Sequence, residues 1–170
     1  MRTPALVLDN SVVIAWALGG CHPGADAVMD LLVEGKARVP SLWPMEFANV
    51  LLVAERRKRL TEADAVRVKE MVLSLPITVV PDDPTRILST VLALAREQDL
   101  SVYDAAYLDL AMREGLPLAT VNQKLRDAAR RCSVPLLVEE PIKPEPTRGA
   151  KRKNPGTRPK APPPPRRGAE

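Results

Sequence analysis

Short, continuous apolar runs alternate along this chain with longer stretches in which apolar residues recur every three or four positions. Apolar runs of four residues or fewer predict buried strands, here at residues 5–8, 77–80, 116–119 and 136–138. The longer stretches predict helices with one buried face. Strands that alternate with helices over short connections favour right-handed crossovers and a parallel sheet covered on both sides. We therefore predict an α/β fold, a three-layer α/β/α sandwich with a central parallel sheet.

Two of the predicted helices, over residues 43–59 and 61–75, form a hairpin. The second begins with Thr61-Glu62-Ala63-Asp64, which is typical of a helix start, and it ends before Pro76 because proline disfavours the helical conformation of the preceding residue. In parallel sheets the functional crevice lies outside the carboxyl ends of the strands. Polar residues at two such ends therefore become candidates, Asp9 and the segment 120–122.

The formal net charge of +4 is unevenly distributed. Residues 141–170 carry nine Lys/Arg and two acids, whereas residues 1–140 carry sixteen Lys/Arg and nineteen acids. The final segment also holds nine of the 18 prolines and few large apolar residues, which predicts one folded domain at 1–140 and a disordered basic tail at 141–170. The tail is either a loose tether for RNA or an acidic surface, or a solvated segment without a partner.

Cysteine usage and hydropathy place the protein in the cytoplasm in our prediction. Cys21 and Cys132 have neither the spacing of a zinc site nor the number expected of a disulfide framework, which favours two reduced thiols. The apolar runs at 5–8 and 12–18 are divided by Asp9-Asn10-Ser11, and each is too short to span a membrane. We expect neither a signal peptide nor a membrane helix.

Three acidic residues stand at strand ends or beside apolar helix faces. Asp9 follows the first predicted strand, Glu46 lies beside the apolar stripe formed by Trp43 and Phe47, and Asp104 falls on the inward side of a helix start. Each has a simpler interpretation: Asp9 and Asp104 can cap helices, and Glu46 can form a salt bridge or lie at the rim of the core.

The three acids matter more when they are taken together, because no other catalytic motif competes with them. The sequence has no Ser-His-Asp or Cys-His arrangement and no Gly-rich phosphate loop, and its one histidine, His22, falls in a predicted loop. Three converging carboxylates without a basic partner repel one another, and Mg²⁺ or Mn²⁺, which prefer oxygen ligands, relieve that repulsion. We therefore expect a divalent metal site.

Four segments that carry these residues stand in a fixed order along the chain. They are LVLDNS at 6–11, WPMEFANVL at 43–51, YDAAYL at 103–108 and LATVNQKL at 118–125. In content and order they resemble the PIN domains of the VapC toxin family, and the resemblance covers about residues 4–138. The basic tail lies outside it.

The resemblance implies an Mg²⁺- or Mn²⁺-dependent endoribonuclease that hydrolyses phosphodiester bonds in structured RNA, such as a loop of tRNA or rRNA. Asp9, Glu46 and Asp104 match the family's acidic catalytic and metal-binding positions, and Ser11 and Thr120 match its polar supporting positions. The resemblance also implies a VapB-type antitoxin whose peptide enters the acidic groove, and a homodimer.

One supporting position departs from the family pattern, because Asn122 stands where an aspartate is common. An amide oxygen can coordinate a metal or hold a water, but it brings no negative charge. The departure weakens the attraction for a second ion more than for the first, and restoring aspartate at 122 is expected to raise metal affinity. The alternative function is a weakly active or inactive PIN domain that serves as an RNA-binding or scaffold module.

Two further features of the sequence each have two interpretations, and a third is expected to have no function. Trp16 and Trp43 either pack in the core or offer a stacking surface to bases. The basic run 56–59 either contacts phosphates or complements a helix dipole. Asp109 and Arg113 are four residues apart, which predicts a solvated pair on a helix surface without functional importance.

Overall fold

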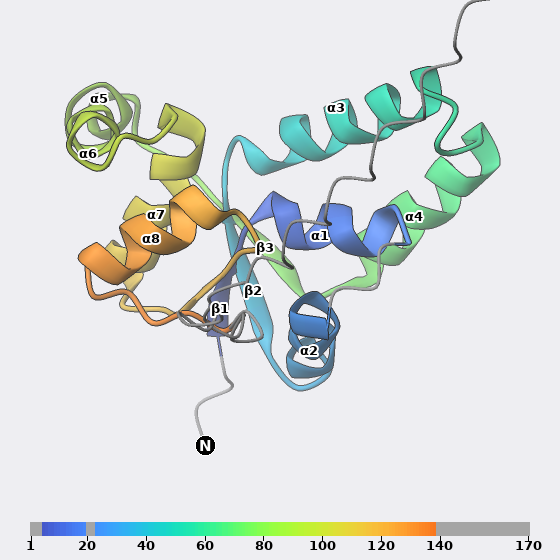
Figure 1. Cartoon of the computed structure of the whole chain (residues 1–170), viewed down its shortest axis with the longest axis horizontal. Coiled ribbons are helices and arrows are strands. Elements are labelled where there is room, and N and C mark those ends of the chain that lie inside the picture. Colours follow the sequence, from blue (N-terminus) through green and yellow to red (C-terminus); the bar gives the residue numbers. More distant parts are fainter. Residues whose placement is uncertain (1–4, 20–22, 139–170) are drawn as a thin grey trace, which may run out of the picture. The chain divides into compact units, whose positions relative to one another are not determined.

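Residues 5–19 and 23–138 are described by a computed structural model, in which they form a parallel four-stranded sheet with helices around it (Figure 1). The strands are β1 (Ala5–Leu8), β2 (Lys36–Pro40), β3 (Ile77–Val80) and β4 (Leu118–Ala119), in the order β3-β2-β1-β4. Leu6, Val7 and Leu8 of the inner strand β1 are at most 3% exposed. The apolar run that predicts β1 is thus buried on both faces of the sheet, as a parallel strand requires.

Helices cover both sides of this sheet, which confirms the predicted three-layer α/β/α sandwich (Figure 1). On one side lie α1 (Asn10–Ala17), α2 (Pro23–Leu32), α3 (Trp43–Arg56) and α4 (Glu62–Ser74). On the other lie α5 (Pro84–Arg86), the π-helical segment η1 (Ile87–Val91), α6 (Leu92–Gln98), α7 (Val102–Glu114) and α8 (Gln123–Arg131). Because α7 packs directly against β1 and β2, the centre of the sheet fixes its position.

The strand β2 is not predicted by the apolar pattern, although it pairs with both β1 and β3. Lys36 and Arg38 interrupt its apolar run, and the structure shows where their charges go. Lys36 is exposed, and Arg38 forms an ion pair with Glu114 at the end of α7. A strand whose polar side chains reach solvent or an ion partner can therefore lie inside the sheet, and run length alone misses it.

The predicted strand at 136–138 is shorter than expected and pairs with β4 through a single bridge, between Leu118 and Leu136. Two backbone hydrogen bonds hold it: the Leu118 N–H donates to the Pro135 carbonyl at 2.8 Å, and the Leu137 N–H donates to the Leu118 carbonyl at 3.1 Å. Because proline has no N–H to donate, Pro135 prevents the ladder from extending toward the N-terminus.

The predicted helix hairpin is confirmed by the contact between α3 and α4. At the start of α4 the Asp64 N–H donates to the Thr61 hydroxyl at 3.1 Å, and the Thr61 N–H donates to the Asp64 carboxylate at 3.3 Å, so the two residues form a capping box. Helix α3 ends at Arg56 rather than at the predicted residue 59. Lys58 has a left-handed φ of 55°, a conformation that does not continue a helix.

Asp109 and Arg113 pair as predicted, but the prediction that this pair is solvated is wrong. Asp109 is only 5% exposed, and Arg86 donates two hydrogen bonds to its carboxylate, at 2.9 and 2.7 Å. Arg113 lies 3.8 Å from Asp109 and donates a hydrogen bond to Asp82 at 3.1 Å. Helical spacing identifies partners on the same helix but not those from another part of the chain. The Arg86–Asp109 and Arg113–Asp82 pairs both join α7 to the segment that follows β3.

Both tryptophans pack against the core rather than offer a free stacking face. Trp43 is 5% exposed and stacks on Phe47, with ring centroids 5.6 Å apart. Trp16 is partly buried, and its indole N–H donates to the Ala25 carbonyl at 2.9 Å. Trp16 thus has the usual arrangement of a structural tryptophan, a packed ring with a partner for its polar edge, whereas the Trp43 indole nitrogen is buried without a hydrogen-bond partner among the described residues.

Some predictions concern residues outside the described ranges. These are the tail at 141–170, the cysteine at 21 and the histidine at 22. Within the described ranges, none of the helices combines the length and the apolar character that crossing a membrane requires.

Candidate metal centre

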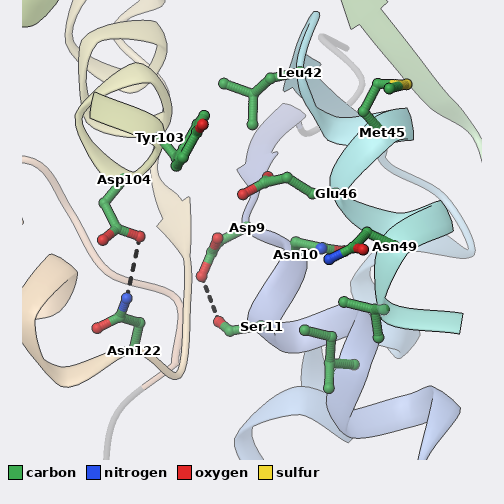
Figure 2. A pocket seen from close by; sticks show the side chains of 12 residues that line it. Asp9, Asn10, Ser11, Leu42, Met45, Glu46, Asn49, Tyr103, Asp104 and Asn122 are labelled. Atoms are coloured by element: carbon green, nitrogen blue, oxygen red, sulfur yellow. Dashed lines mark hydrogen bonds between the residues drawn. The ribbon is translucent and has the colours of Figure 1, made fainter. Parts of the chain in front are cut away.

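A cleft of about 500 Å³ lies at the carboxyl ends of β1 and β4, the edge where a parallel sheet places its functional crevice (Figure 2). All but one of the polar side chains that line it come from four helix starts. The polar lining residues are Asp9, Asn10, Ser11, Glu46, Tyr103, Asp104 and Asn122 and, further along α3, Asn49. Segments more than a hundred positions apart therefore meet at one place. All three acids that the sequence singles out line this cleft.

Asp9 occupies the position between β1 and α1, and it is 4% exposed. It makes no side-chain capping bond to α1. One of its carboxylate oxygens, Oδ2, accepts hydrogen bonds from the hydroxyls of Ser11 and, at 2.7 Å, of Thr120. Burial raises the pKa of the Asp9 carboxyl, the two hydroxyl hydrogen bonds oppose that rise, and the charge of Asp104 adds to it. Asp9 is thus a buried carboxylate held by neutral donors.

The two hydroxyls that hold Asp9 are themselves held by the backbone that follows β4. The Val121 N–H donates to the Ser11 hydroxyl at 3.1 Å, and the Asn122 N–H donates to the Thr120 hydroxyl at 3.0 Å. Thr120 is fully buried. Each hydroxyl accepts one of these N–H groups and donates its own proton to Asp9. Ser11 and Thr120 therefore have the supporting geometry that the sequence pattern suggests.

Glu46 lies on the first turn of α3 and is partly buried. The phenol hydroxyl of Tyr107, on α7, donates a hydrogen bond to its Oε2 oxygen. Burial raises the pKa of the Glu46 carboxyl, the Tyr107 hydrogen bond opposes the rise, and the charges of Asp9 and Asp104 increase it further. Among the described residues no Lys or Arg forms a salt bridge with Glu46, so the salt-bridge interpretation does not hold for this part of the chain, whereas its partial burial agrees with a position at the rim of the core.

Asp104 stands on the first turn of α7 and has two partners. Its Oδ2 accepts a hydrogen bond from the Ser101 hydroxyl at 2.8 Å, while its own N–H donates to that hydroxyl at 3.0 Å. Its Oδ1 accepts a hydrogen bond from the amide nitrogen of Asn122 at 3.2 Å (Figure 2). Ser101, not Asp104, caps α7, so the simpler interpretation of Asp104 as a helix cap does not hold; one of its oxygens accepts from the Ser101 hydroxyl, and the other turns toward the cleft and Asn122.

Asn122 presents its amide nitrogen, not its oxygen, to the acids. Its Oδ1 accepts hydrogen bonds from the backbone N–H groups of Lys124 at 3.1 Å and Leu125 at 3.5 Å, and so caps α8. The expectation that the amide oxygen serves a metal does not match this arrangement. Asp127 cannot replace a missing carboxylate either, because it lies away from the cleft and pairs with Arg130 at 2.9 Å.

The donor set of the cleft fits a hard divalent cation by its chemistry. Its carboxylates and amides offer oxygen, the ligand type of Mg²⁺ and Mn²⁺. The Asn10 Oδ1 is buried without a hydrogen-bond partner and belongs to the same cleft. In the two described ranges no three acidic, His or Cys side chains stand close enough to enclose an ion as they are placed. A bound ion would draw the carboxylates closer, since it removes their mutual repulsion.

Two residues of this site are missed by sequence reasoning. Tyr107 follows Asp104 by three residues, which places both on one face of α7, and this spacing is the signal that could have identified it. The orphan oxygen of Asn10 had no such signal, because an asparagine at a helix start is equally typical of a cap. The missed residues are the neutral groups around the acids.

Comparison with known proteins identifies the fold family. The PIN domain model matches residues 6–131, and no curated protein matches the sequence. The protein PAE2754 from Pyrobaculum aerophilum has a similar structure, with a TM-score of 0.57 and 29% identity over 75% of this chain and 87% of that one. A toxin–antitoxin complex from Klebsiella pneumoniae has a TM-score of 0.50 and 22% identity, over 70% of this chain and 88% of that one.

A further similar structure is VapBC2 from Rickettsia felis bound to a DNA fragment from their promoter. It has a TM-score of 0.55 and 14% identity, over 78% of this chain and 96% of that one. At 14% and 22% identity the toxin–antitoxin structures share the fold with this chain. The family model covers most of the described chain, and its members are generally nucleases. The resemblance drawn from the four sequence motifs is thereby confirmed, and the chain belongs to the PIN domain family.

Proposed function

We propose that this PIN domain is an Mg²⁺- or Mn²⁺-dependent endoribonuclease and the toxin of a VapBC-type toxin–antitoxin pair. One observation carries the proposal. Asp9, Glu46 and Asp104 line a single cleft, and no Lys or Arg of the described residues lines it with them. Asp9 is buried and Glu46 and Asp104 are partly buried. Carboxylates withdrawn from water without a cationic partner are costly to a fold, so their gathering at a strand-end crevice indicates a use for a cation.

A divalent ion in this cleft would supply Lewis-acid polarisation of a scissile phosphate and a more acidic bound water. The chain's own residues orient the carboxylates that would bind the ion. Ser11 and Thr120 fix one oxygen of Asp9, which leaves its other oxygen free of hydrogen bonds from described side chains. Asn122 orients Asp104, and Glu46 brings the third carboxylate from the opposite wall (Figure 2). These hydrogen bonds restrict the carboxylates before an ion binds, and a bound ion would then draw them closer together.

We propose a single-stranded loop of a structured RNA, such as a tRNA or rRNA, as the substrate. Duplex RNA hides its base edges and keeps its backbone regular, whereas a loop can bend its backbone into a crevice. The cleft also has apolar walls, to which Ile14, Leu42 and Met45 contribute, and Met45 is 78% exposed at its rim. Apolar rims suit splayed bases better than they suit a charged backbone.

The proposed activity is tested by incubating the full chain with end-labelled structured RNA and Mn²⁺. We expect internal cleavage that a chelator abolishes and that excess Mn²⁺ restores, because the acids alone cannot activate water at the phosphate. Cleavage that persists in the chelator would contradict the metal dependence. RNA that binds but stays intact with either metal would favour the RNA-binding or scaffold alternative, which the amide at Asn122 supports.

The antitoxin part of the proposal rests on a groove that continues the cleft between α1 and α3. This groove has a volume of about 210 Å³, and Ile14 and Val50 line both it and the cleft. Its far end, beyond α3, carries Arg57 and Arg59. The surface therefore runs from acidic through apolar to basic. We propose that an antitoxin peptide lies along it, with a basic side chain at the acids and an acidic one at the arginines.

Co-expression with the product of the neighbouring reading frame tests this partner. We expect the two proteins to purify together and RNA cleavage to be blocked. Val50→Asp should prevent co-purification, because it places a charge in the apolar part of the groove. Leu73→Asp is the matched control, since Leu73 is 72% exposed on α4 and does not line the groove. Equal loss in both variants would show that the groove is not the binding surface.

A further inference from the structure

Tyr107 is buried beside the cleft without lining it. It is 1% exposed and belongs to the main hydrophobic core, so its ring alone explains its place in the fold. Its hydroxyl is a different matter, because a buried O–H requires a partner. That partner is the Glu46 carboxylate, to which the hydroxyl donates.

The hydrogen bond joins two helices that each carry an acid of the cleft. Tyr107 follows Asp104 by three residues on α7, and Glu46 stands on α3. The flexible Glu46 side chain is therefore tied to the helix that supplies Asp104. The bond uses Oε2 of Glu46, and Figure 2 shows the carboxylate of Glu46 directed toward Asp9 and Asp104. The other oxygen, Oε1, has no hydrogen-bond donor among the described side chains.

We infer that Tyr107 is a positioning residue that holds Glu46 in its orientation for a divalent cation. This inference rests on the proposed metal-dependent function. The competing explanation is that the hydroxyl is satisfied by a carboxylate that would take the same position without it. The two differ in what happens when only the hydroxyl is removed. Groups that orient metal ligands change metal affinity by about 10- to 100-fold when they are lost, whereas a core ring without such a role leaves that affinity unchanged.

Tyr107→Phe removes the hydroxyl and keeps the ring. Mn²⁺ binding to the full chain, measured by calorimetry in the absence of RNA, is expected to weaken by about tenfold. Ser74→Ala is the control: it also removes one hydroxyl, which donates to the Met71 carbonyl at 2.6 Å on α4, and Ser74 does not line the cleft. We expect its Mn²⁺ affinity to equal that of the unmodified chain.

A second variant separates positioning from a general loosening of the fold. In the Glu46→Gln background, Tyr107→Phe should cause no further loss of Mn²⁺ affinity, because the group that Tyr107 positions is already altered; such non-additivity marks residues that act together. The inference is overturned if Tyr107→Phe leaves Mn²⁺ affinity unchanged, or if it weakens affinity equally with Glu46 and with Gln at that position.

The binding measurement also keeps this inference distinct from the proposed function. If the chain binds Mn²⁺ and Tyr107→Phe weakens the binding, but no RNA is cleaved, the positioning role stands and the nuclease proposal falls. If RNA is cleaved with Mn²⁺ and Tyr107→Phe changes neither binding nor cleavage, the nuclease proposal stands and the positioning role falls. A chain that binds no Mn²⁺ overturns both.

Discussion

Asp9→Asn is expected to lower Mn²⁺-dependent RNA cleavage by about 10³-fold, because charge stabilisation by a catalytic metal contributes several kcal/mol to the barrier. The same variant should make the metal-free protein more stable, by about 1 kcal/mol. Asparagine can still accept hydrogen bonds from Ser11 and Thr120 through its amide oxygen, while the buried negative charge disappears. Activity and stability thus move in opposite directions at one position.

The stability gain should depend on pH with a definite sign. Burial raises the pKa of Asp9, so the folded protein binds this proton more tightly than the unfolded chain does. Its contribution to the free energy of unfolding is therefore present at low pH and is lost as pH rises from about 4 through the raised pKa. The melting temperatures of Asp9→Asn and the unmodified chain should nearly agree in acid and separate toward neutral pH.

Thermal melting in a chelator, repeated across pH, measures this difference, and the RNA assay measures the loss of cleavage. Asp30→Asn is the matched control, because it removes an exposed carboxylate from α2 and should change neither quantity. A variant Asp9→Asn that cleaves RNA normally would contradict the placement of Asp9 at the reactive centre. Lower stability at neutral pH would contradict the cost that we assign to its buried charge.

Mn²⁺ is expected to stabilise the chain against heat by about 2.7 kcal/mol when its concentration is 100 times the dissociation constant. Asp104→Asn should abolish most of this gain, since it removes a carboxylate from the cleft. Asn122→Asp should increase the gain, because it replaces the amide nitrogen that faces Asp104 with a charged oxygen. It should also lower the stability of the metal-free protein, where two carboxylates would then repel each other.

Calorimetric melting with and without Mn²⁺ gives both quantities for each variant. Asp127→Asn on α8 is the control, because Asp127 pairs with Arg130 outside the cleft and its loss should leave the Mn²⁺ effect unchanged. An identical Mn²⁺ effect in the unmodified chain and in Asp104→Asn would place the ion elsewhere. An unchanged effect in Asn122→Asp would show that position 122 does not contribute to metal affinity.

The sheet could be predicted where strands are continuously apolar and not where charge enters them. Residues 5–8 form the predicted buried strand, whereas residues 77–80 form a strand at the edge of the sheet in which no residue is buried, so that only its position was predicted correctly. β2 was not predicted because Lys36 and Arg38 interrupt its apolar pattern. The charge of Arg38 is accommodated by an ion pair with Glu114, and that pair depends on the fold. The pairing of Arg86 with Asp109 was not predicted for the same reason, since a partner 23 positions away leaves no pattern in the local spacing of residues.

The residues of the site also fall into those that could be predicted from the sequence and those that could not. Asp9, Glu46 and Asp104 were identifiable because a carboxylate at a strand end or beside an apolar helix face conflicts with its surroundings and calls for an explanation. The groups that hold these acids cause no such conflict. A tyrosine in a helix is an ordinary core residue. Whether Asn122 turns its amide nitrogen or its amide oxygen toward the acids depends on where the free N–H groups of α8 lie.

Among the described residues the cleft is lined by acids and by no arginine or lysine, which has a consequence for the proposed reaction. The proposed substrate, RNA, is a polyanion and would meet like charge at the place of cleavage, and encounter slows as charges of the same sign approach. A divalent ion bound among the carboxylates would lower this barrier to entry before any bond is broken. We therefore expect the rate of RNA entry to rise with the free divalent ion concentration and to depend on the ionic strength of the medium.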